Sequence, residues 1–384
     1  MLPFPNQPKL QIVFCALETY SLVGGLQNFN RRVVKGLIWR ANSRGEAPPE
    51  VHVLRDRDSV PKNLSIDIKS YPTRTSYLFR SAVSSLKANM FVIGHVNLLP
   101  LAAMVRCLRW RMPILLFVHG DEVWNEPTRR KKRWYDRLFL LAVNRIASVS
   151  QHTADVMAKE FRLSPTKFTV LPNAVDSIDL PRCGPEKEAP VVLTVSRLSS
   201  GDRQKNIDQM LKSIALVKER VPDVRYEVVG DGPLRDELQR LADDLGISGN
   251  VSFLGRLSET ELAQAYLRAA VFALPSSKEG FGIVYLEAWL RLLPVLCSSF
   301  GAAKEVVSDG RDGFVVDHRD CDAIADRLHE LLTDRSLARR FGEHGRKKVE
   351  TKYLNSSFQT NLNAIIDDLQ VEFLASGFER PPTK

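Results

Sequence analysis

The sequence has few cysteines, and none of them is spaced for a metal site. The five cysteines are far apart in the 384-residue chain, and no CxxC pair or Cys/His cluster occurs; they are Cys15, Cys107, Cys183, Cys297 and Cys321. A structural zinc site is therefore not expected, and a reducing compartment, the cytoplasm, is the expected location.

Long hydrophobic runs are missing as well. The stretch 91–105 is interrupted by His95 and Asn97, and it is shorter than the roughly 20 residues of a membrane-spanning helix. The first residues lack a basic stretch followed by an apolar signal core. These absences predict a chain that stays in the cytoplasm.

The remaining composition fits a large globular protein. Its hydrophobic content of 44% and charged content of 26% are typical of soluble domains, and 384 residues are too many for one ordinary core. Two domains are therefore expected. The formal net charge of +9 favours anionic partners, but it does not choose among nucleotides, nucleic acid and anionic lipid.

Short, apolar, β-branched runs alternate with helical patterns, and the alternation occurs twice. Such runs indicate buried parallel strands. They cover 11–17, 51–54, 90–96, 114–119, 146–150 and 168–172 in the first half, and 191–196, 224–230, 251–255, 271–276 and 294–298 in the second. The expected fold class is α/β, with two Rossmann-like, doubly wound domains that face each other across a cleft.

The polar, proline-containing segment 176–190 separates the two halves and is expected to be a linker. Residues 1–175 would form the N-terminal domain and residues 191–365 the C-terminal domain. The tail, 366–384, is expected to contain a helix that returns toward the N-terminal domain.

Two common nucleotide-binding motifs are absent. No G-x-G-x-x-G follows the first expected strand and no P-loop occurs in the chain, which argues against a dinucleotide-dependent dehydrogenase and a P-loop kinase. In doubly wound sheets, ligands bind beyond the carboxyl ends of the strands. The residues that follow each strand are therefore the candidates for a site.

The sequence SSKEGFGIVYLEAW, residues 276–289, contains a glycine-flanked turn. Gly280 and Gly282 permit close backbone approach, and a helix is expected to begin at Gly282 or Ile283 and to run past Arg291. The first N–H groups of a helix have no partner within it, and the helix dipole favours an anion there. The turn therefore suits a phosphate.

An acid lies on each side of this turn, and both are expected to bind sugar hydroxyls. Glu279 lies in the loop, within reach of hydroxyls near the phosphate. Glu287 lies more than one helical turn further on, where its two oxygens suit a vicinal diol such as a ribose. The alternative is a helix-capping acid together with a solvated helical acid.

A basic pair supports the phosphate site. Arg197 directly follows the strand at 191–196, and Lys205 comes eight residues later. A planar guanidinium and a compact ammonium together suit a diphosphate. Arg203 competes with Lys205, although the sequence KNID at the start of a helix favours Lys205. An ordinary basic surface loop is the alternative.

Two further strand ends lie in the first half. Gly24 and Gly25 follow the first strand and would let backbone amides approach a phosphate or sugar; a tight turn is equally compatible with them. His119 ends another strand, before Gly120, and would hydrogen-bond a sugar hydroxyl or stabilise charge at the reacting centre. The alternative is a structural histidine.

Together these motifs resemble those of glycosyltransferase family 4, retaining enzymes with the GT-B fold. The resemblance covers nearly the whole chain, through GG at 24–25, HG at 119–120, PNAVD at 172–176, SR and K at 196–205, and EGFGIVYLE at 279–287. One departure lies at 298–305. The family often has Gly-Gly and a proline before a glutamate, and here Ser299, Phe300, Gly301 and Lys304 precede Glu305.

The resemblance implies a nucleotide-sugar donor, a UDP- or GDP-sugar, bound mainly by the C-terminal domain. Arg197 and Lys205 would hold its diphosphate, Glu287 its ribose, and residues 254–258 its base. The donor sugar and β-phosphate would be held by Glu279 and by the turn that comprises Gly280, Phe281, Gly282 and Ile283.

The acceptor would enter from the N-terminal side, near Gly24, Gly25 and His119, with Gly25 also touching the donor. His119, Arg197, Lys205 and Glu279 are the expected catalytic residues.

The resemblance also implies a mechanism without an enzymic nucleophile. The leaving diphosphate would help to deprotonate the acceptor on the face from which it departs, so cationic stabilisation of that phosphate would be the main catalytic device. No metal or other cofactor is expected, because Arg, Lys and a helix N-terminus replace a cation. The product would be a hexose on a glycan, with a lipid-linked acceptor expected and a soluble small molecule as the alternative.

Three other classes remain to be compared. The triplet Asp56-Arg57-Asp58 follows a strand and would suit a metal-dependent GT-A transferase, although such triplets are frequent by chance. A glycoside hydrolase would need two acids facing one glycosidic bond, which Glu287 on a helix is poorly placed to provide. A nucleic-acid binder would use the basic run, but no recognition module accompanies it, so no nucleic-acid partner is expected.

The segment TRRKKRWYDRLFLLAVNR, residues 128–145, combines a basic run with apolar residues. At helical spacing Trp134, Leu138 and Leu141 share one face, and residues 106–111 add three arginines and a tryptophan. Such a combination suits an anionic membrane surface at the inner face of the membrane, in cell-surface polysaccharide or glycolipid assembly. The alternative is that Leu138 and Leu141 pack in the core.

Overall fold

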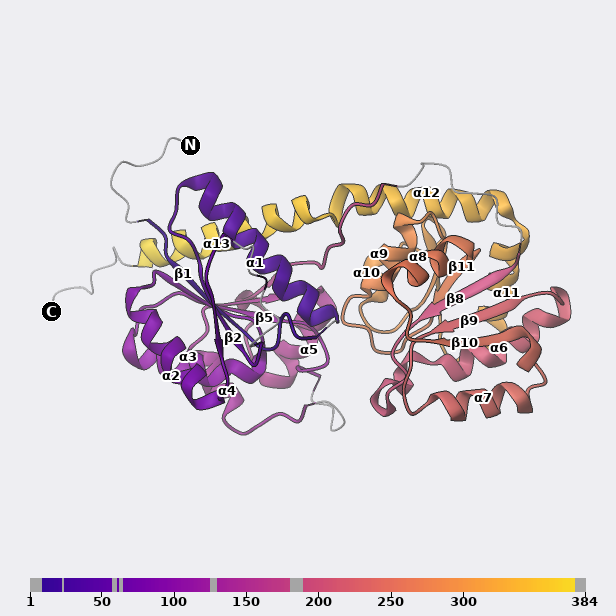
Figure 1. Cartoon of the computed structure of the whole chain (residues 1–384), viewed down its shortest axis with the longest axis horizontal. Coiled ribbons are helices and arrows are strands. Elements are labelled where there is room, and N and C mark those ends of the chain that lie inside the picture. The colour runs from indigo at the N-terminus through magenta and orange to yellow at the C-terminus, as the bar shows by residue number, and fades with distance from the viewer. Residues whose placement is uncertain are drawn as a thin grey trace. The chain divides into compact units, whose positions relative to one another are not determined.

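A computed structural model describes residues 9–22, 24–56, 61, 65–124, 130–179 and 189–376 of the chain (Figure 1). The chain divides into two compact units. Unit 1 comprises residues 1–173 and 355–384, and unit 2 comprises residues 174–354. Each unit contains one wholly parallel sheet, as the alternating apolar runs predict.

The sheet of unit 1 has seven strands within the described residues, in the order β3-β2-β1-β4-β5-β6-β7. The strands are β1 Ile12–Ala16, β2 Glu50–Leu54, β3 Ile68–Tyr71, β4 Met90–Ile93, β5 Ile114–Val118, β6 Arg145–Ser148 and β7 Phe168–Val170. The helices are α1 Gly25–Arg44, α2 Arg74–Ser84, α3 Leu99–Leu108, α4 Asp136–Leu141, α5 Gln151–Phe161 and α13 Asn355–Ser376, with short 3-10 helices at Ser85–Lys87, Val96–Leu98 and Pro165–Lys167.

Helices cover both faces of this sheet. Successive side chains of a strand point to opposite faces, and because the central strands are apolar throughout, both faces need to be covered. In β1, Val13 and Cys15 belong to the core that α2 and α3 cover. Phe14 lies on the other face against Phe117, where Phe29 of α1 is also packed. In Figure 1, α1 and α13 lie on one side of the sheet and α2, α3 and α4 on the other.

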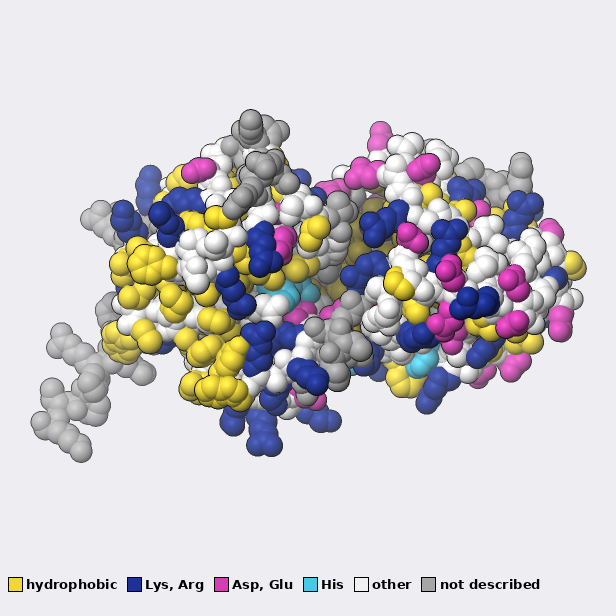
Figure 2. Space-filling model, turned by 60° about the horizontal axis from the view of Figure 1, so that its bottom comes forward, with side chains coloured by type: hydrophobic (Ala, Val, Ile, Leu, Met, Phe, Trp, Pro, Cys, Tyr) yellow, Lys and Arg dark blue, Asp and Glu magenta, His cyan; other side chains and the backbone are white. Residues whose placement is uncertain are grey.

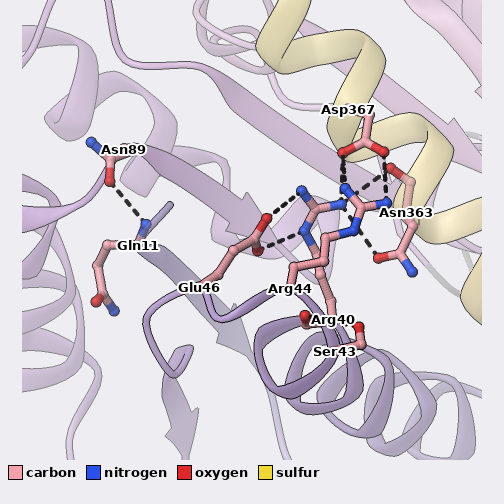
Figure 3. Close-up of polar contacts among 8 residues, drawn as sticks. All are labelled: Gln11, Arg40, Ser43, Arg44, Glu46, Asn89, Asn363 and Asp367. Carbon is pink, nitrogen blue, oxygen red and sulfur yellow. Dashed lines mark hydrogen bonds and ion pairs between the residues drawn. The ribbon is translucent and has the colours of Figure 1, made fainter. Parts of the chain in front are cut away.

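The last helix, α13, completes the core of unit 1. Phe358 meets Phe29 with ring centroids 5.4 Å apart. The buried Arg40 of α1 pairs with Asp367 of α13 at 2.8 Å and with Glu46 at 2.8 Å (Figure 3). The chain therefore returns to unit 1 at residue 355, eleven residues before the expected start of the tail at residue 366.

The sheet of unit 2 has six strands within the described residues, in the order β10-β9-β8-β11-β12-β13. The strands are β8 Val191–Val195, β9 Arg225–Val229, β10 Val251–Gly255, β11 Val271–Leu274, β12 Val295–Ser298 and β13 Gly313–Val316. The helices are α6 Ile207–Arg220, α7 Arg235–Asp244, α8 Glu259–Arg268, α9 Ile283–Leu290, α10 Ala303–Val306, α11 Cys321–Thr333 and α12 Arg335–Lys352, with 3-10 helices η4 Ser200–Lys205 and η5 Ser248–Asn250.

All eleven expected strands are present, but the sequence patterns missed β3 and β13. The sequence of β3, IKSY, is half polar because it lies at the edge of its sheet, and β13 begins with a glycine. The expected linker is only partly visible, since residues 180–188 lie outside the described part of the chain.

None of the described helices is both long enough and apolar enough to cross a membrane.

Candidate active site

The candidate donor site of unit 2 lies where the strand order changes direction. β8 and β11 are neighbours, and the chain proceeds from them to opposite edges, through β9 and β10 on one side and β12 and β13 on the other. Such a switch point opens a crevice at the carboxyl ends of the two strands. Arg197 follows β8 and Glu279 follows β11, so the two strand ends with predicted site residues are adjacent.

Lys205 and Glu279 are brought together, as an ion pair with 2.7 Å between Nζ and Oε2. Hydrogen bonds between the loops position the pair: the Ser277 amide donates to the Gln204 carbonyl at 2.8 Å, and the Asn206 side chain donates to the Pro275 carbonyl at 2.7 Å. Both charged side chains are largely buried, so the pair interacts more strongly than a surface ion pair would.

The other two basic residues of this loop have different environments. The Arg197 guanidinium is exposed and lies 3.3 Å from the buried carboxylate of Asp202. Asp202 in turn forms a capping box with Ser199 that fixes η4. Arg203 makes a two-pronged pair with Glu237, both contacts at 2.6 Å, on the surface. The structure therefore gives Lys205, and not Arg203, the position beside Glu279.

The glycine turn begins α9 as predicted. Gly282 has φ of 90°, in the left-handed region that favours glycine, and it is the residue immediately before the helix. The helix ends at Leu290, so the expectation that it runs past Arg291 is wrong. Leu292 adopts φ of 60°, which a continuing helix does not allow.

The departure at 298–305 preserves the support of this turn. Gly301 has φ of 72°, and a Cβ there would lie 2.8 Å from the Glu279 nitrogen. The next amide, of Ala302, donates to the Glu279 carbonyl at 2.9 Å. Gly301 thus lets this loop approach the Glu279 backbone closely, and the amide of Ala302 holds the Glu279 carbonyl.

Phe281 and Glu287 complete the predicted set in unit 2. Phe281 is buried, with its ring centroid 5.7 Å from that of Tyr353. Glu287 is half-buried, and its Oε2 accepts a hydrogen bond from the Tyr266 hydroxyl at 3.0 Å. The structure therefore excludes the interpretation of Glu287 as a merely solvated helical acid.

Sequence reasoning missed the loop Gly230–Pro233, which follows β9. The Leu198 amide donates to the Asp231 carbonyl at 3.1 Å, and the Leu234 amide donates to the Leu198 carbonyl at 2.9 Å. This loop therefore fixes the backbone on which Arg197 sits. Its sequence GDGP was the available signal, since it follows a strand and opens a helix.

In unit 1 the two early glycines open α1. Gly24 is extended, with φ of 173°, and Gly25 is the first residue of the helix. Neither has the backbone conformation that a glycine-specific tight turn needs. A Cβ on Gly25 would meet no atom within 4 Å, so no packing contact among the described residues explains the glycine.

His119 is half-buried at the end of β5. Its Nε2 lies 3.2 Å from the Gly94 carbonyl, and its ring makes an edge contact with Phe29 at 4.6 Å between centroids. A carbonyl only accepts, so Nε2 carries the proton and Nδ1 is the acceptor atom of the neutral ring. Burial lowers the pKa of His119 and Glu122 opposes this, so the ring is neutral at pH 7.

A second histidine, His95, lies on the neighbouring strand end after β4 and was not singled out as a site residue. Burial lowers the pKa of His95 to about 4. Its Nδ1 accepts a hydrogen bond from the Asn97 amide at 3.0 Å, which fixes the first turn of a 3-10 helix. This hydrogen bond indicates that His95 has a structural role, which is to hold the start of the 3-10 helix Val96–Leu98.

Asp56, from the triplet considered for a metal-dependent transferase, is fully buried. Its carboxylate accepts hydrogen bonds from the amides of Thr19, Tyr20 and Ser21 and from the Ser21 hydroxyl, at 2.6 to 3.0 Å. Asp56 therefore holds the loop after β1, and Asp58 lies outside the described residues. Within the described part of the chain no group of three or more His, Cys, Asp or Glu side chains is placed to hold a metal ion.

Comparison with known proteins covers most of the chain. Residues 25–177 match the family model described as Glycosyltransferase Family 4, and residues 179–348 match that of Glycosyl transferases group 1. A curated relative, the GDP-mannose-dependent alpha-(1-6)-phosphatidylinositol monomannoside mannosyltransferase of Mycolicibacterium smegmatis, is 34% identical over 52% of this chain and 56% of its own length. The lipopolysaccharide core biosynthesis glycosyltransferase LpsE of Rhizobium meliloti is 30% identical over 53% and 54%.

The chain thus spans about half the length of these curated relatives. Among solved structures, the apo form of the lipopolysaccharide outer core galactosyltransferase WaaB has a TM-score of 0.72 at 16% identity, over 94% of this chain and 99% of that one. Anabaena HepE in complex with UDP and glucose has a TM-score of 0.72 at 15% identity, over 94% and 100%. At such identities these structures show the fold, which is GT-B.

Proposed function

Because the chain belongs to glycosyltransferase family 4, we propose that it transfers a hexose from a nucleotide-sugar donor to a glycan acceptor, with retention of configuration at the anomeric carbon. The observation that carries the proposal is the Lys205–Glu279 pair beside the N-terminus of α9, at the switch point of the unit 2 sheet. A cation, a carboxylate and the first amides of a helix converge there, which suits a phosphate joined to a sugar.

The donor contacts follow from the chemistry of each side chain. Lys205 and Arg197 bind the diphosphate, and the amides that begin α9 bind its β-phosphate. Glu279 accepts hydrogen bonds from hydroxyls of the transferred hexose, held in place by its pair with Lys205. Glu287 accepts hydrogen bonds from the ribose.

In the proposed reaction the bond between the hexose anomeric carbon and the β-phosphate oxygen breaks. The acceptor hydroxyl forms the new bond on the same face, and its proton passes to the leaving diphosphate. Negative charge develops on that diphosphate, so Lys205, Arg197 and the α9 amides stabilise the transition state. The fixed cations take the place of a metal ion, and treatment with EDTA is expected to leave turnover unchanged.

His119 acts on the acceptor side of the proposed site. Its protonated Nε2 faces the Gly94 carbonyl, and Nδ1 of the neutral ring accepts a hydrogen bond from a sugar hydroxyl. Gly25 lacks a side chain at the start of α1, so a ligand can approach its amide.

We propose a GDP- or UDP-sugar as the donor and a lipid-linked glycan as the acceptor, in glycolipid or cell-surface polysaccharide assembly. The names of the relatives support this choice, since they include GDP-mannose-dependent enzymes and a lipopolysaccharide core enzyme. A soluble acceptor is the alternative, and it makes the same demands on the donor site.

The first test is the binding of a bare nucleotide. GDP or UDP, at about 100 times its Kd, is expected to raise the Tm by about 5 °C or more, because a ligand of the native state stabilises it by RT ln(1 + [L]/Kd). ADP is the control for the base. If none of the three nucleotides shifts the Tm at millimolar concentration, the donor assignment is wrong.

A surface of unit 1 supports the proposed membrane location. Its exposed apolar side chains come from the adjacent helices α2, α3 and α4 and from residues that flank them, and the most exposed are Trp134 at 87%, Trp110 at 74%, Phe79 at 66% and Leu141 at 64%. The set, called here the apolar face, is Phe79, Val83, Leu86, Leu108, Trp110, Trp134, Leu138 and Leu141. Figure 2 shows yellow side chains gathered over this side of unit 1.

The structure corrects three details of the segment 128–145. Leu138 and Leu141 are exposed, so the interpretation that they pack in the core is wrong. α4 begins only at Asp136, so Trp134 precedes the helix and does not share its register. Arg130 is buried in a pair with Asp136 at 2.7 Å and is not a surface cation, and Arg129 lies outside the described residues.

The exposed charges of α2, α3 and α4 are all positive. No Asp or Glu occurs from residue 68 to residue 120, a stretch that carries seven Lys or Arg and includes α2 and α3. α4 contains one acidic residue, Asp136, which is buried in its ion pair with Arg130. Exposed tryptophans surrounded by cations suit the interface of an anionic bilayer, where each nearby Lys or Arg contributes about 1 kcal/mol.

Liposome co-sedimentation tests the membrane location. Wild-type protein is expected to pellet with vesicles that contain 30% phosphatidylserine, about tenfold more than with neutral vesicles, and to be released by 0.5 M salt. The double variant Leu138→Asp/Leu141→Asp is expected to stay in the supernatant. Val371→Asp, which charges an exposed apolar residue of α13 outside the face, is the matched control and is expected to pellet. Recovery of both proteins in the supernatant would leave a soluble acceptor as the better interpretation, and equal pelleting of both would show that the apolar face is not the membrane contact.

A further inference from the structure

A buried tyrosine and an arginine surround Glu287, although neither belongs to the motifs of the donor site. Tyr266 of α8 is completely buried, and its hydroxyl donates to Glu287 Oε2 at 3.0 Å. The Arg291 guanidinium lies over the Tyr266 ring, 4.8 Å from its centroid, and also donates to the Glu287 backbone carbonyl at 3.0 Å. Tyr266 thus holds the Glu287 carboxylate directly, and Arg291 supports both the Tyr266 ring and the Glu287 backbone.

The Tyr266 hydroxyl is a permanent donor toward Glu287. Burial and the neighbouring Glu287 raise the pKa of Tyr266 well above its ordinary value, so the phenol keeps its proton at any physiological pH. A carboxylate has about four acceptor positions, so one bond from Tyr266 is compatible with two more from a diol. The bond therefore orients Glu287 without exhausting its capacity to accept.

The aromatic packing behind Tyr266 makes this orientation rigid. The Tyr266 ring stacks on Phe272 of β11 at 5.9 Å, and Phe272 makes an edge contact with Tyr285 of α9, also at 5.9 Å. The Tyr285 hydroxyl donates to the Leu274 carbonyl at 2.8 Å. The ring that holds Glu287 is therefore joined to the strand end from which the glycine turn departs.

We propose that Tyr266 and Arg291 are positioning residues that hold the Glu287 carboxylate in the orientation that receives the 2′- and 3′-hydroxyls of the donor ribose. This inference rests on the proposed function, because it assumes a ribonucleotide at the site. The preference for a ribose over a sugar without those hydroxyls then depends on a residue that does not touch the nucleotide. Removing the hydroxyl of Tyr266 leaves Glu287 in place with more than one orientation.

Calorimetry with matched nucleotides measures this preference. The probes are GDP and UDP and their 2′,3′-dideoxy counterparts, and the measured quantity is the ratio of the two Kd values for one base. Wild-type protein is expected to bind the ribonucleotide at least ~20-fold more tightly, since hydrogen bonds to a charged group are the strong ones. In Tyr266→Phe the ratio is expected to fall to about 3, and in Arg291→Met to an intermediate value.

The matched control is Tyr226→Phe. Tyr226 is also completely buried in unit 2, and its hydroxyl donates to Thr194 at 2.9 Å, away from Glu287. The control loses the same atom and a similar amount of stability, but is expected to keep the full ratio. A merely structural Tyr266 would lower the Tm as Tyr226→Phe does and leave the ratio unchanged, and that result would overturn the inference.

The outcomes separate this inference from the proposed function. If wild-type protein binds none of the four nucleotides, the donor assignment itself fails. If it binds ribo- and dideoxynucleotides equally well, the donor assignment stands and the placement of Glu287 at the ribose is wrong. If it discriminates and Tyr266→Phe discriminates equally, only the positioning role is wrong.

Discussion

Replacing Lys205 with alanine is expected to lower kcat/KM for the nucleotide-sugar by ~10²-fold or more, because a fixed cation beside the developing diphosphate charge is lost. The loss has a second part in this protein. Lys205 neutralises Glu279 at 2.7 Å, so its removal also leaves an uncompensated carboxylate beside the phosphate. The measurement is nucleoside diphosphate release with the donor concentration varied.

Arg203→Ala is the matched control for Lys205→Ala. Both residues lie in η4, but Arg203 pairs with Glu237 on the surface, where an ion pair contributes little to stability. The control is expected to stay within about twofold of the wild-type rate. A Lys205→Ala variant with the same small effect would remove Lys205 from the proposed mechanism.

The variant Glu279→Ala distinguishes the two partners of this pair. It is expected to bind bare nucleotide nearly as well as the wild type, since the Glu279 partner in the complex is the hexose, but to lose turnover. A large loss of bare nucleotide affinity would place Glu279 at the nucleotide instead.

Replacing His119 with alanine is expected to lower kcat by ~10²-fold, because the hydrogen bond from a sugar hydroxyl to Nδ1 is lost at the reacting centre. The Tm is also expected to fall by a few degrees, since the contacts with Phe29 and the Gly94 carbonyl disappear. Phe29→Leu is the matched control, because it weakens the same ring contact and removes no polar group. It is expected to lower the Tm to a similar extent and to keep kcat.

The pH dependence gives the His119 assignment a second measurement. Burial lowers the pKa of His119, so the folded protein holds the ring neutral where the unfolded chain would already protonate it. Stability is therefore expected to fall as the pH drops below the unfolded value, about 6.5, whereas activity is expected to persist to a lower pH and to fall only as the pH passes through the lowered pKa of the folded protein. Proportional losses of Tm and activity in both His119→Ala and Phe29→Leu would indicate a structural histidine.

The sequence predicted a residue's role best where that role depends on the neighbouring residues in the chain. The start of α9 at Gly282 or Ile283 could be predicted because a glycine permits an unusual backbone conformation before an apolar run, and in the structure Gly282 immediately precedes the helix. Lys205 was favoured over Arg203 because it adjoins the start of a helix, and the pairing with Glu279 agrees. Residues whose roles depend on their immediate neighbours in the chain can be identified from the sequence.

Residues whose partners are distant in the chain could not be found this way. In the sequence Asp56 looks like part of a surface triplet. In the structure it is buried, and it accepts hydrogen bonds from backbone amides 35 to 37 positions earlier in the chain. Tyr266 has the helical spacing of an ordinary core residue, and its partner Glu287 is 21 positions away. No local pattern distinguishes a tyrosine that orients a carboxylate from one that only fills space.

The long return of α13 to the first unit has a consequence for synthesis on the ribosome. When residue 173 emerges, unit 1 still lacks the helix that covers Phe29 and pairs with Arg40, and all of unit 2 must be made before that helix appears. At ordinary elongation rates this takes roughly 10 to 40 s, during which an aromatic cluster and a cation destined for the interior remain open to solvent. The nascent chain is thus exposed to misfolding or proteolysis during this interval, which ends only when α13 has left the ribosome.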